Sequence, residues 1–323
     1  MFTLSELEAA AALVHAAFPP TPTHAWPLLA DRVGAEIWVK HENHTPTGAF
    51  KVRGGVTYMD RLRRRRPDCP GIVSATRGNH GQSLAYAGRR AGVPVTILVP
   101  HGNSPEKNAA MRAFGARLIE HGRDFDEARA EARALADRDG LEFAPSFHPD
   151  LVVGVATAAW ELFRAAPVPD VLYVPIGLGS GICAAILVRD LLGLSTEIVG
   201  VQAAGAPAYA LSYAAGHVVE TDRADTRADG MATRIPDPAA LAIIRAGASR
   251  IVTVTDDEIA AAIRAYWTDT HNLAEGAGAA PLAAALRDRP HRSCRLALVL
   301  SGGNLDLDLF QEWVASPADP VQA

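Results

Sequence analysis

The sequence predicts an α/β fold in which mostly parallel sheets are covered by helices. Three observations predict this fold. Short apolar runs alternate with helical patterns along most of the 323 residues, which indicates strand–helix–strand crossover units. Two of these runs, Gly71–Ala75 and Val171–Pro175, lead into glycine-containing turns. At about 150 residues per domain, the length corresponds to about two domains.

The elements follow from local patterns, taken in chain order. An alanine-rich segment, Ser5–Ala17, predicts a helix with the capping pair Ser5 and Glu8. Short apolar, β-branched runs then predict strands, which are Ala35–Lys40, Gly71–Ala75, Val93–Val99, Ala116–Glu120, Val171–Pro175, Glu197–Gln202, Arg250–Val254 and Arg295–Leu300. Longer periodic segments predict helices, which are His80–Ala91, Pro105–Phe114, Asp124–Asp137, Val153–Ala165, Gly181–Leu192 and Asp256–Thr268.

Two loops are candidate crossing points between domains. Pro145–Asp150 contains two prolines and precedes a predicted helix. Gly216–Pro238 is long and polar, but strand and helix patterns resume on both sides of it. Because a long loop inside a compact domain is usually functional or mobile, the second loop is the weaker candidate.

Composition excludes several classes of protein. The net charge of -5 argues against a surface that binds nucleic acid. The three cysteines lie far apart and show no metal-ligand spacing, which favours a reduced, cytoplasmic protein. No signal peptide is evident, and no apolar stretch reaches membrane-spanning length.

Lysine is scarce in this chain. Of 31 basic residues, only Lys40, Lys51 and Lys107 are lysines, and lysine, unlike arginine, can lose its proton and act as a base or nucleophile. Lys51 lies in the segment TGAFKVRGG between Phe50 and Val52. Apolar neighbours would desolvate its amine and lower its pKa, as a Schiff base or proton abstraction requires. The alternative is a surface lysine with a solvated head group.

A second cluster is SATRGNHGQS, residues 74–83. It follows a predicted strand and opens a helix near His80, where backbone amides bind carboxylate or phosphate. Gly78 and Gly81 permit the close approach of a ligand, and Asn79 offers it both a donor and an acceptor. The alternative is a helix cap and a tight turn.

A third cluster is VPIGLGSGICAA, residues 174–185, in which a strand runs into a glycine-rich turn and then a helix. This pattern is typical of a phosphate site, with amides from Gly177, Leu178, Gly179, Ser180 and Gly181. A dinucleotide is disfavoured because Ile182 replaces the third glycine of the fingerprint and Glu197 opens the next strand. A glycine turn without a ligand is the alternative.

The fourth cluster is LSGGN, residues 300–304, at the end of the last predicted strand. It places the neutral hydroxyl of Ser301 where a ligand meets the sheet, although a simple helix cap is also consistent with it.

The order of the four clusters resembles the fold type II pyridoxal-phosphate enzymes over nearly the whole chain. TGAFKVRGG and the GNHGQ of residues 78–82 are similar to the threonine and serine dehydratase branch.

The resemblance implies two three-layer domains with the cofactor, pyridoxal 5'-phosphate, in the cleft between them. Residues 1–63 plus 150–323 would form the large cofactor-binding domain, and residues 64–149 the small domain with the substrate loop. The chain would have no C-terminal regulatory domain. A homodimer is expected. The other expected partner is a small amino-acid substrate.

The resemblance also implies roles at matching positions. Lys51 would hold the cofactor as a Schiff base and later act as the general base, with Phe50 packed near the ring. Asn79 would hydrogen-bond the phenolic oxygen, and Ser301 would face the pyridine nitrogen and leave it unprotonated. The remaining cofactor positions would be Gly177, Leu178, Gly179, Ser180, Gly181, Gly230 and Glu275. The loop that holds the substrate carboxylate would comprise Thr76, Arg77, Gly78, Asn79 and His80.

The implied reaction is the β-elimination of an L-3-hydroxy amino acid to a 2-keto acid and ammonia. Arg77 stands where racemizing relatives have a serine, and as a poor base it makes racemase activity unexpected. It would instead contact a substrate carboxylate, stack on an aromatic substrate or engage the cofactor, so threonine, serine and 3-phenylserine all stay candidates. Ala49 replaces the usual serine before the Phe-Lys pair.

The usual metal-binding carboxylates of the family are absent at Gln202 and near Ala208, so no divalent metal site is expected. Two rival functions stay open: a nicotinamide-dependent oxidoreductase, suggested by the glycine turn alone, and a non-catalytic amino-acid sensor on the same fold. Lys51 counts against the sensor, because a sensor has no need of a Schiff base.

Overall fold

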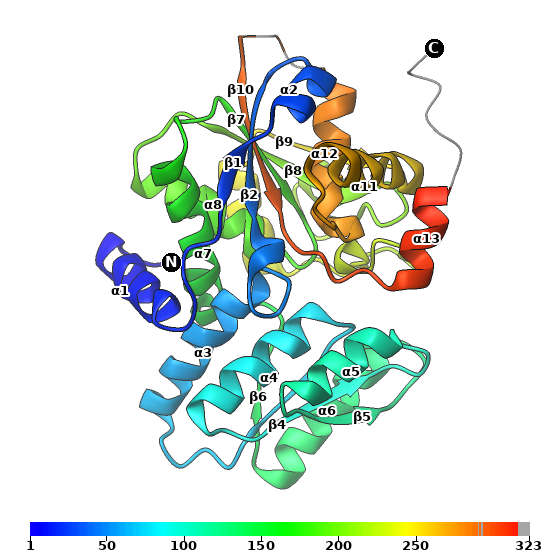
Figure 1. The fold of residues 1–323 in the computed structure, drawn as a ribbon. Helices are drawn as coiled ribbons and strands as arrows, with labels where there is room; N and C mark the ends of the chain where they lie inside the picture. The colour runs from blue at the N-terminus through cyan, green and yellow to red at the C-terminus, as the bar shows by residue number, and fades with distance from the viewer. Residues whose placement is uncertain (290, 292, 316–323) are drawn as a thin grey trace. The chain divides into compact units, whose positions relative to one another are not determined.

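The structure is a computed structural model that describes residues 1–289, 291 and 293–315. It divides into two compact units, of which unit 1 comprises Met1–Pro19 and Thr45–Thr157, and unit 2 comprises Pro20–His44 and Ala158–Ala323. Both units have helices around a mostly parallel sheet (Figure 1). The α/β fold with mostly parallel sheets is therefore confirmed.

Unit 1 has a parallel four-stranded sheet in the order β5-β4-β3-β6. Its strands are β3 (Ile72–Ala75), β4 (Val95–Val99), β5 (Arg117–Glu120) and β6 (Glu142–Phe143). Its helices are α1 (Leu4–His15), α3 (Lys51–Arg65), α4 (Asn79–Ala91), α5 (Pro105–Ala113), α6 (Phe125–Asp139) and the first part of α7 (Pro149–Ala165).

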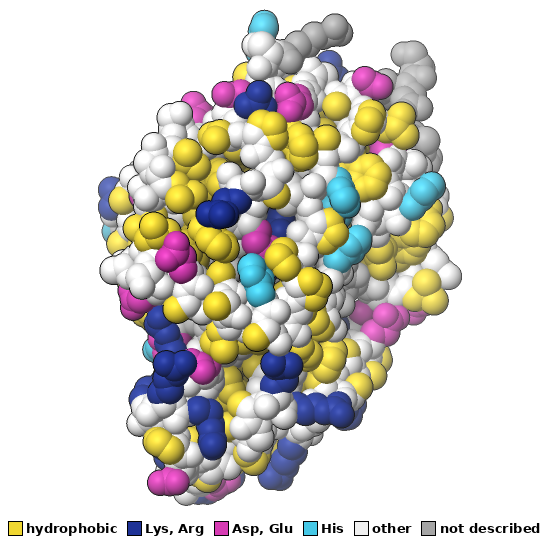
Figure 2. Space-filling model, turned by 60° about the vertical axis from the view of Figure 1, so that its left-hand side comes forward, with side chains coloured by type: hydrophobic (Ala, Val, Ile, Leu, Met, Phe, Trp, Pro, Cys, Tyr) yellow, Lys and Arg dark blue, Asp and Glu magenta, His cyan; other side chains and the backbone are white. Residues whose placement is uncertain are grey.

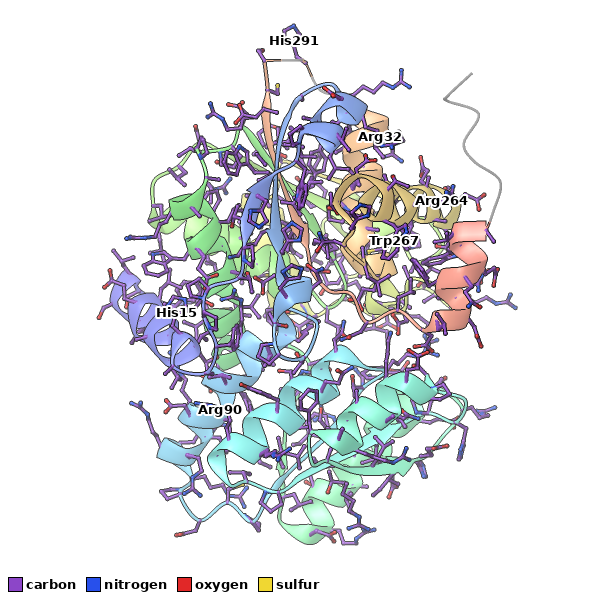
Figure 3. All side chains as sticks on the ribbon, in the orientation of Figure 1. His15, Arg32, Arg90, Arg264, Trp267 and His291 are labelled. Carbon is purple, nitrogen blue, oxygen red and sulfur yellow. The ribbon has the colours of Figure 1, made fainter. Side chains whose placement is uncertain are left out.

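The strands of unit 1 supply two cores because their side chains alternate between the faces of the sheet. Ile72 and Ile97 pack with residues of α3, α4 and α5, whereas their neighbours Val73 and Leu98 pack against α6. The result is a three-layer unit. Figure 3 labels His15 near the end of α1 and Arg90 near the end of α4, and the Arg90 guanidinium donates to the Ala16 carbonyl at 3.3 Å.

Unit 2 has a six-stranded sheet in the order β1-β2-β10-β7-β8-β9. Its strands are β1 (Thr23–Ala25), β2 (Glu36–His41), β7 (Val171–Pro175), β8 (Glu197–Ala203), β9 (Arg250–Val254) and β10 (Arg295–Leu300). β1 pairs antiparallel with β2, and the other pairs are parallel. The carboxyl ends of β7, β8 and β10 therefore lie at one edge of this sheet, where ligands bind in such folds.

Helices and short 3-10 turns complete unit 2. They are α2 (Pro27–Val33), η1 (Glu42–His44), the last part of α7, α8 (Ser180–Leu191), α9 (Ala208–Ala215), η2 (Asp229–Met231), α10 (Pro238–Gly247), α11 (Asp256–Thr270), α12 (Gly276–Asp288) and α13 (Leu307–Ala315). The largest core cluster lies between the sheet and the α2, α11, α12 and α13 helices. Among the described residues, no helix is both long and apolar enough to span a bilayer.

Each of the eight predicted strands is present, with ends that differ by no more than two residues. β1 and β6 were not predicted, because runs of three and two residues leave no periodic signal. The predicted capping pair of the first helix was wrong. The helix starts earlier, at Leu4, because Thr3 and Glu6 form the capping box instead of Ser5 and Glu8.

The sequence did not predict α3, because glycine is unfavourable inside a helix and this helix contains Gly54 and Gly55. Packing explains both glycines. A Cβ on Gly55 would lie 2.3 Å from Ser83 Oγ of α4, and a Cβ on Gly54 would lie 2.8 Å from the carbonyl oxygen of Leu151 on α7. These helices approach closely only without side chains at the two positions.

The packing units divide the chain differently from the predicted domains. α3 packs on α1 and α4, so residues 45–63 and 1–19 belong with residues 64–149 in unit 1. The change from unit 1 to unit 2 falls inside α7, after Thr157, rather than in the Pro145–Asp150 loop. The functional division into a large domain (1–63 plus 150–323) and a small domain (64–149) stays a prediction.

Candidate active site

The glycine-rich turn of unit 2 connects the end of β7 to the start of α8. Gly179 caps the helix with a left-handed φ of 94°, and Ser180 begins it. A Cβ on Gly177 would lie 2.3 Å from the carbonyl oxygen of Gly230, so this turn and the Gly230 segment touch through backbone atoms. The turn thus presents backbone amides at the positive end of a 12-residue helix, which is a suitable site for a phosphate.

Tyr209, on α9, supports this turn from behind. Its buried hydroxyl donates to the carbonyl oxygen of Leu178 at 3.0 Å and accepts from the Asp237 amide at 3.0 Å. Burial raises the pKa of this phenol, so it keeps its proton. Tyr209 was not predicted as a site residue, because a single tyrosine in an alanine-rich helix carries no local signal for this contact.

Glu275 and Ser301 are brought together at the same end of the sheet. Ser301 follows β10 directly, and Glu275 immediately precedes α12. The Glu275 amide donates to the carbonyl oxygen of Gly302 at 3.0 Å. Gly230 is close too, since a Cβ there would lie 3.9 Å from Glu275 Oε1. Strands β7 and β10 are neighbours, so the predicted unit 2 residues form one contiguous group.

In unit 1, Lys51 is the first residue of α3 and Phe50 is its N-cap residue. The Lys51 ammonium lies 5.0 Å from the centre of the Phe50 ring, and its side chain is partly exposed. The Ser83 hydroxyl of α4 donates to the Lys51 carbonyl at 2.6 Å. Lys51 is thus held at the start of α3, and a hydrogen bond from α4 fixes that start.

The predicted carboxylate loop leads from β3 into α4. The Gly78 amide donates to Thr76 Oγ1 at 3.0 Å, and the Thr76 amide donates to the Leu98 carbonyl at 3.1 Å. Arg77 is exposed and Asn79 is partly exposed, whereas Thr76, Gly78 and His80 are buried. The α4 helix starts at Asn79, so the loop offers amides where a carboxylate is favourable.

His80 is the most strongly perturbed group of this loop. Burial, strengthened by the positive charge of Lys51, lowers the pKa of its imidazole to about 3, although a backbone hydrogen bond with Ala144 acts in the opposite direction. Its Nε2 is buried and has no hydrogen-bond partner within the described part of the chain. His80 therefore stays neutral at any working pH and presents a lone pair.

The predicted site residues fall into two groups. Phe50, Lys51 and Thr76 to His80 belong to unit 1, whereas Gly177 to Gly181, Gly230, Glu275 and Ser301 belong to unit 2. Each group is brought together within its own unit. That both groups bind one cofactor stays a prediction.

The position predicted to lack a metal carboxylate lies at the end of β8. Gln202 is fully buried, and its Oε1 accepts from the Ala210 amide at 2.8 Å. The side chain thus contacts the start of α9 with its oxygen. The prediction that no divalent metal binds here stays a prediction.

Comparisons with known proteins cover nearly the whole chain. Residues 14–302 match the family described as "Pyridoxal-phosphate dependent enzyme". An L-threonine ammonia-lyase of Geobacter sulfurreducens is 37% identical over 86% of this chain and 69% of its own length. An L-threo-3-hydroxyaspartate ammonia-lyase of Pseudomonas sp is 31% identical over 90% of this chain and 91% of its own. The solved structure of threonine deaminase isoform 2 from Solanum lycopersicum superimposes with a TM-score of 0.88 and 28% identity, covering 98% of this chain and 95% of that one.

Proposed function

Because the chain belongs to the family of pyridoxal-phosphate dependent enzymes, we propose that it is an ammonia-lyase that acts on an L-3-hydroxy amino acid. The substrate class comprises threonine, serine and 3-phenylserine, and the products are a 2-keto acid and ammonia. Relatives named as threonine and hydroxyaspartate ammonia-lyases support the β-elimination. The observation that carries the proposal is the position of Lys51. This partly exposed lysine begins α3, and its backbone carbonyl accepts a hydrogen bond from Ser83 of α4, the helix that follows the carboxylate loop.

The residues present fit the chemical groups of pyridoxal phosphate. An aldehyde requires a primary amine, which Lys51 supplies. A phosphate requires converging amides, and the 177–181 turn presents them where a Cβ on Gly177 would collide with Gly230. A ring nitrogen that is to stay unprotonated requires a neutral partner, and Ser301 is a buried hydroxyl. Asn79, partly exposed, suits the phenolic oxygen.

The cofactor, when bound, supplies an electron sink for the charge that develops at the α-carbon. Residues of the chain move the α-proton and bind the substrate. The amine of Lys51 takes the α-proton as a general base. The loop from Thr76 to His80 binds the substrate carboxylate through its amides at the start of α4, which orients the α-carbon towards the base.

Arg77 is the residue that distinguishes this loop. Its side chain is exposed beside the buried Gly78, and arginine is a poor base that binds rather than transfers protons. We assign it to substrate recognition, through a second carboxylate or by stacking on an aromatic β-substituent. This assignment disfavours racemase activity, which requires an acid and base on the face opposite Lys51.

The decisive experiment combines the visible spectrum with borohydride reduction. The purified protein is expected to show a yellow absorption band that reduction removes, with the label recovered on Lys51 by peptide mapping. Keto-acid release from a panel of 3-hydroxy amino acids then identifies the substrate. A colourless protein that pyridoxal phosphate cannot reconstitute, or full activity in Lys51→Ala, would refute the proposal.

The same measurements separate the two rivals. A nicotinamide-dependent oxidoreductase requires added nicotinamide cofactor and gives a change in its absorption. A non-catalytic sensor binds the amino acid but releases no keto acid. The matched family supports neither rival.

We further propose that the enzyme is a cytoplasmic homodimer. Three separate free cysteines, Cys69, Cys183 and Cys294, support a reducing compartment. Light scattering after size-exclusion chromatography gives the mass directly, with twice the 34.1 kDa of one chain expected. A monomeric mass at micromolar concentration would contradict the dimer.

A further inference from the structure

Within the part of the chain that the structure describes, the imidazole of His80 uses one of its two nitrogens. The side chain is 6% exposed, and Nε2 has no partner within the described residues. The backbone hydrogen bond with Ala144 is therefore left to Nδ1, which carries the proton. Nε2 then presents its lone pair as an acceptor.

A buried acceptor without a donor is rare in folded proteins, and it usually marks a place that a ligand or a moving side chain completes. Protonation of Nε2 does not remove the unpaired acceptor of His80. Burial and, to a smaller extent, the charge of Lys51 lower the pKa of His80 to about 3. The donor that completes this site has to come from another group.

The packing of α4 against α3 indicates which group this is. Ser83 of α4 donates to the backbone carbonyl of Lys51 at 2.6 Å. His80 and Ser83 are three residues apart, so they lie on the same face of α4. Gly55 of α3 lies against Ser83, with its Cβ position 2.3 Å from Ser83 Oγ. The face that carries His80 is therefore the face that meets the start of α3, where Lys51 lies.

We infer that His80 is a positioning residue for Lys51: the lysine side chain turns towards α4 when it is protonated, and its ammonium then donates a hydrogen bond to the Nε2 lone pair, in the cofactor-free protein as well as after the amine has taken up the α-proton. The proton stays on Lys51, and the imidazole stays neutral. This inference rests on the proposed role of Lys51 as the base, and it identifies the side chain that holds this base. The hydrogen bond favours the protonated amine, so His80 keeps Lys51 charged to a higher pH than otherwise.

The scarcity of lysine makes a direct test possible. The chain has three lysines, and Lys40 and Lys107 are buried while Lys51 is partly exposed. Trace acetylation of the full-length protein without cofactor, quantified by mass spectrometry across pH 6 to 11, reports how much of the Lys51 amine is deprotonated. No turnover is needed for this readout.

Two substitutions separate the role of Nδ1 of His80 from the role of Nε2. In His80→Asn, the side-chain amide takes the place of Nδ1 towards Ala144, but nothing replaces Nε2. In His80→Gln, the longer side chain carries an amide oxygen towards the place of Nε2. His80→Asn is expected to lower the pH midpoint of Lys51 acetylation by about one unit, which is about tenfold in rate at neutral pH, and His80→Gln is expected to restore much of it.

His148→Asn is the matched control, since it is the same substitution at a half-buried histidine of unit 1. It is expected to leave the Lys51 midpoint unchanged. An unchanged midpoint in His80→Asn would overturn the inference. If His80→Asn does not fold by near-UV circular dichroism, His80→Leu, which also lacks an acceptor in the place of Nε2, decides, because a lowered midpoint supports the hydrogen bond and an unchanged one contradicts it.

The failure of this inference is distinguishable from failure of the proposed function. Acetylation is measured without cofactor, whereas the proposed function stands on the colour and on the borohydride label at Lys51. A label on Lys51 with no effect of His80→Asn on acetylation would remove the inference alone.

Discussion

Lys40 Nζ lies 2.6 Å from Glu161 Oε2 inside unit 2, and both side chains are buried. The same ammonium donates to the Thr21 carbonyl at 2.7 Å. Lys40 comes from β2 and Glu161 from α7, so the pair links a strand to a helix more than one hundred residues away. These contacts make Lys40 a structural lysine rather than a solvated one.

Removing one member of this pair should cost far more than removing both. Lys40→Met removes the ammonium that lies 2.6 Å from the buried Glu161 carboxylate, and we expect the free energy of unfolding to fall by about 3 kcal/mol. Urea denaturation at pH 7.5 measures the loss. The double variant Lys40→Met with Glu161→Leu should recover most of it, and a double variant less stable than Lys40→Met would contradict this account.

His41 should make unit 2 sensitive to acid. Its pKa is lowered to about 3 by burial, with help from the charges of His44, His24 and Lys40, while the Asn43 contact opposes the shift. The unfolded chain binds a proton near pH 6.5, so stability is complete above this pH and is lost progressively as pH falls towards 3. By pH 5.5 the loss is about 1 kcal/mol.

His41→Gln tests this pH dependence. The Trp26 indole donates to His41 Nε2 at 2.9 Å, and the glutamine oxygen can accept the same bond without titrating. Histidine side chains also lie at the surface among hydrophobic and uncharged atoms in Figure 2, and they are left in place in this variant. Urea unfolding at pH 7.5 and 5.5 should show a smaller loss in the variant; equal losses would exclude His41 as the cause.

Gly177→Ala should impair cofactor binding. The new Cβ would lie 2.3 Å from the Gly230 carbonyl oxygen, so one of the two backbone segments has to move. Gly230→Ala is the graded comparison, because its nearest contact is 3.0 Å, to Ala277 Cβ. We expect at least tenfold weaker retention of pyridoxal phosphate in Gly177→Ala during dialysis, followed by absorbance. Weaker retention in Gly230→Ala than in Gly177→Ala would reverse the expected order.

Arg77→Ala should change substrate preference more than cofactor retention. Arg77 is exposed on the predicted carboxylate loop, so truncating its side chain removes little packing. We expect kcat/KM to change about tenfold or more for one class of β-substituent, as the loss of one contact to a charge predicts. Arg63→Ala, at an exposed arginine of α3, is the control and should leave the substrate profile unchanged. The same profile in Arg77→Ala would remove this residue from substrate recognition.

Chelation of divalent metals should leave activity unchanged within about twofold. Gln202 is a neutral amide whose oxygen already accepts from Ala210, and a hard cation prefers anionic oxygen ligands. The measurement is kcat/KM after EDTA treatment and again after magnesium is restored. The double variant Gln202→Glu with Ala208→Asp supplies the missing carboxylates and should gain dependence on magnesium. Strong inhibition of the wild type by EDTA would show that the metal prediction was wrong.

The sequence predicted the fold where local patterns and burial agree. The runs that became β7 and β9 are continuous and apolar enough to be recognised alone, and their bounds were predicted as the structure has them. Helix α3 was missed because its two glycines contradict helix propensity, and only the neighbouring helices explain them. The capping box at Thr3 was missed because Ser5 and Glu8 satisfy the same spacing.

The sequence by itself predicted the chemistry of the candidate site. The scarcity of lysine singled out Lys51, and the glycine turn at residues 177–181 predicted an anion site, because both signals are carried by adjacent residues. Only the tertiary structure decided that Gly177 meets Gly230, that Tyr209 supports the turn and that, within the described residues, Nε2 of His80 has no hydrogen-bond partner. Contact and desolvation depend on segments that are far apart along the chain, and no local pattern of residues records them.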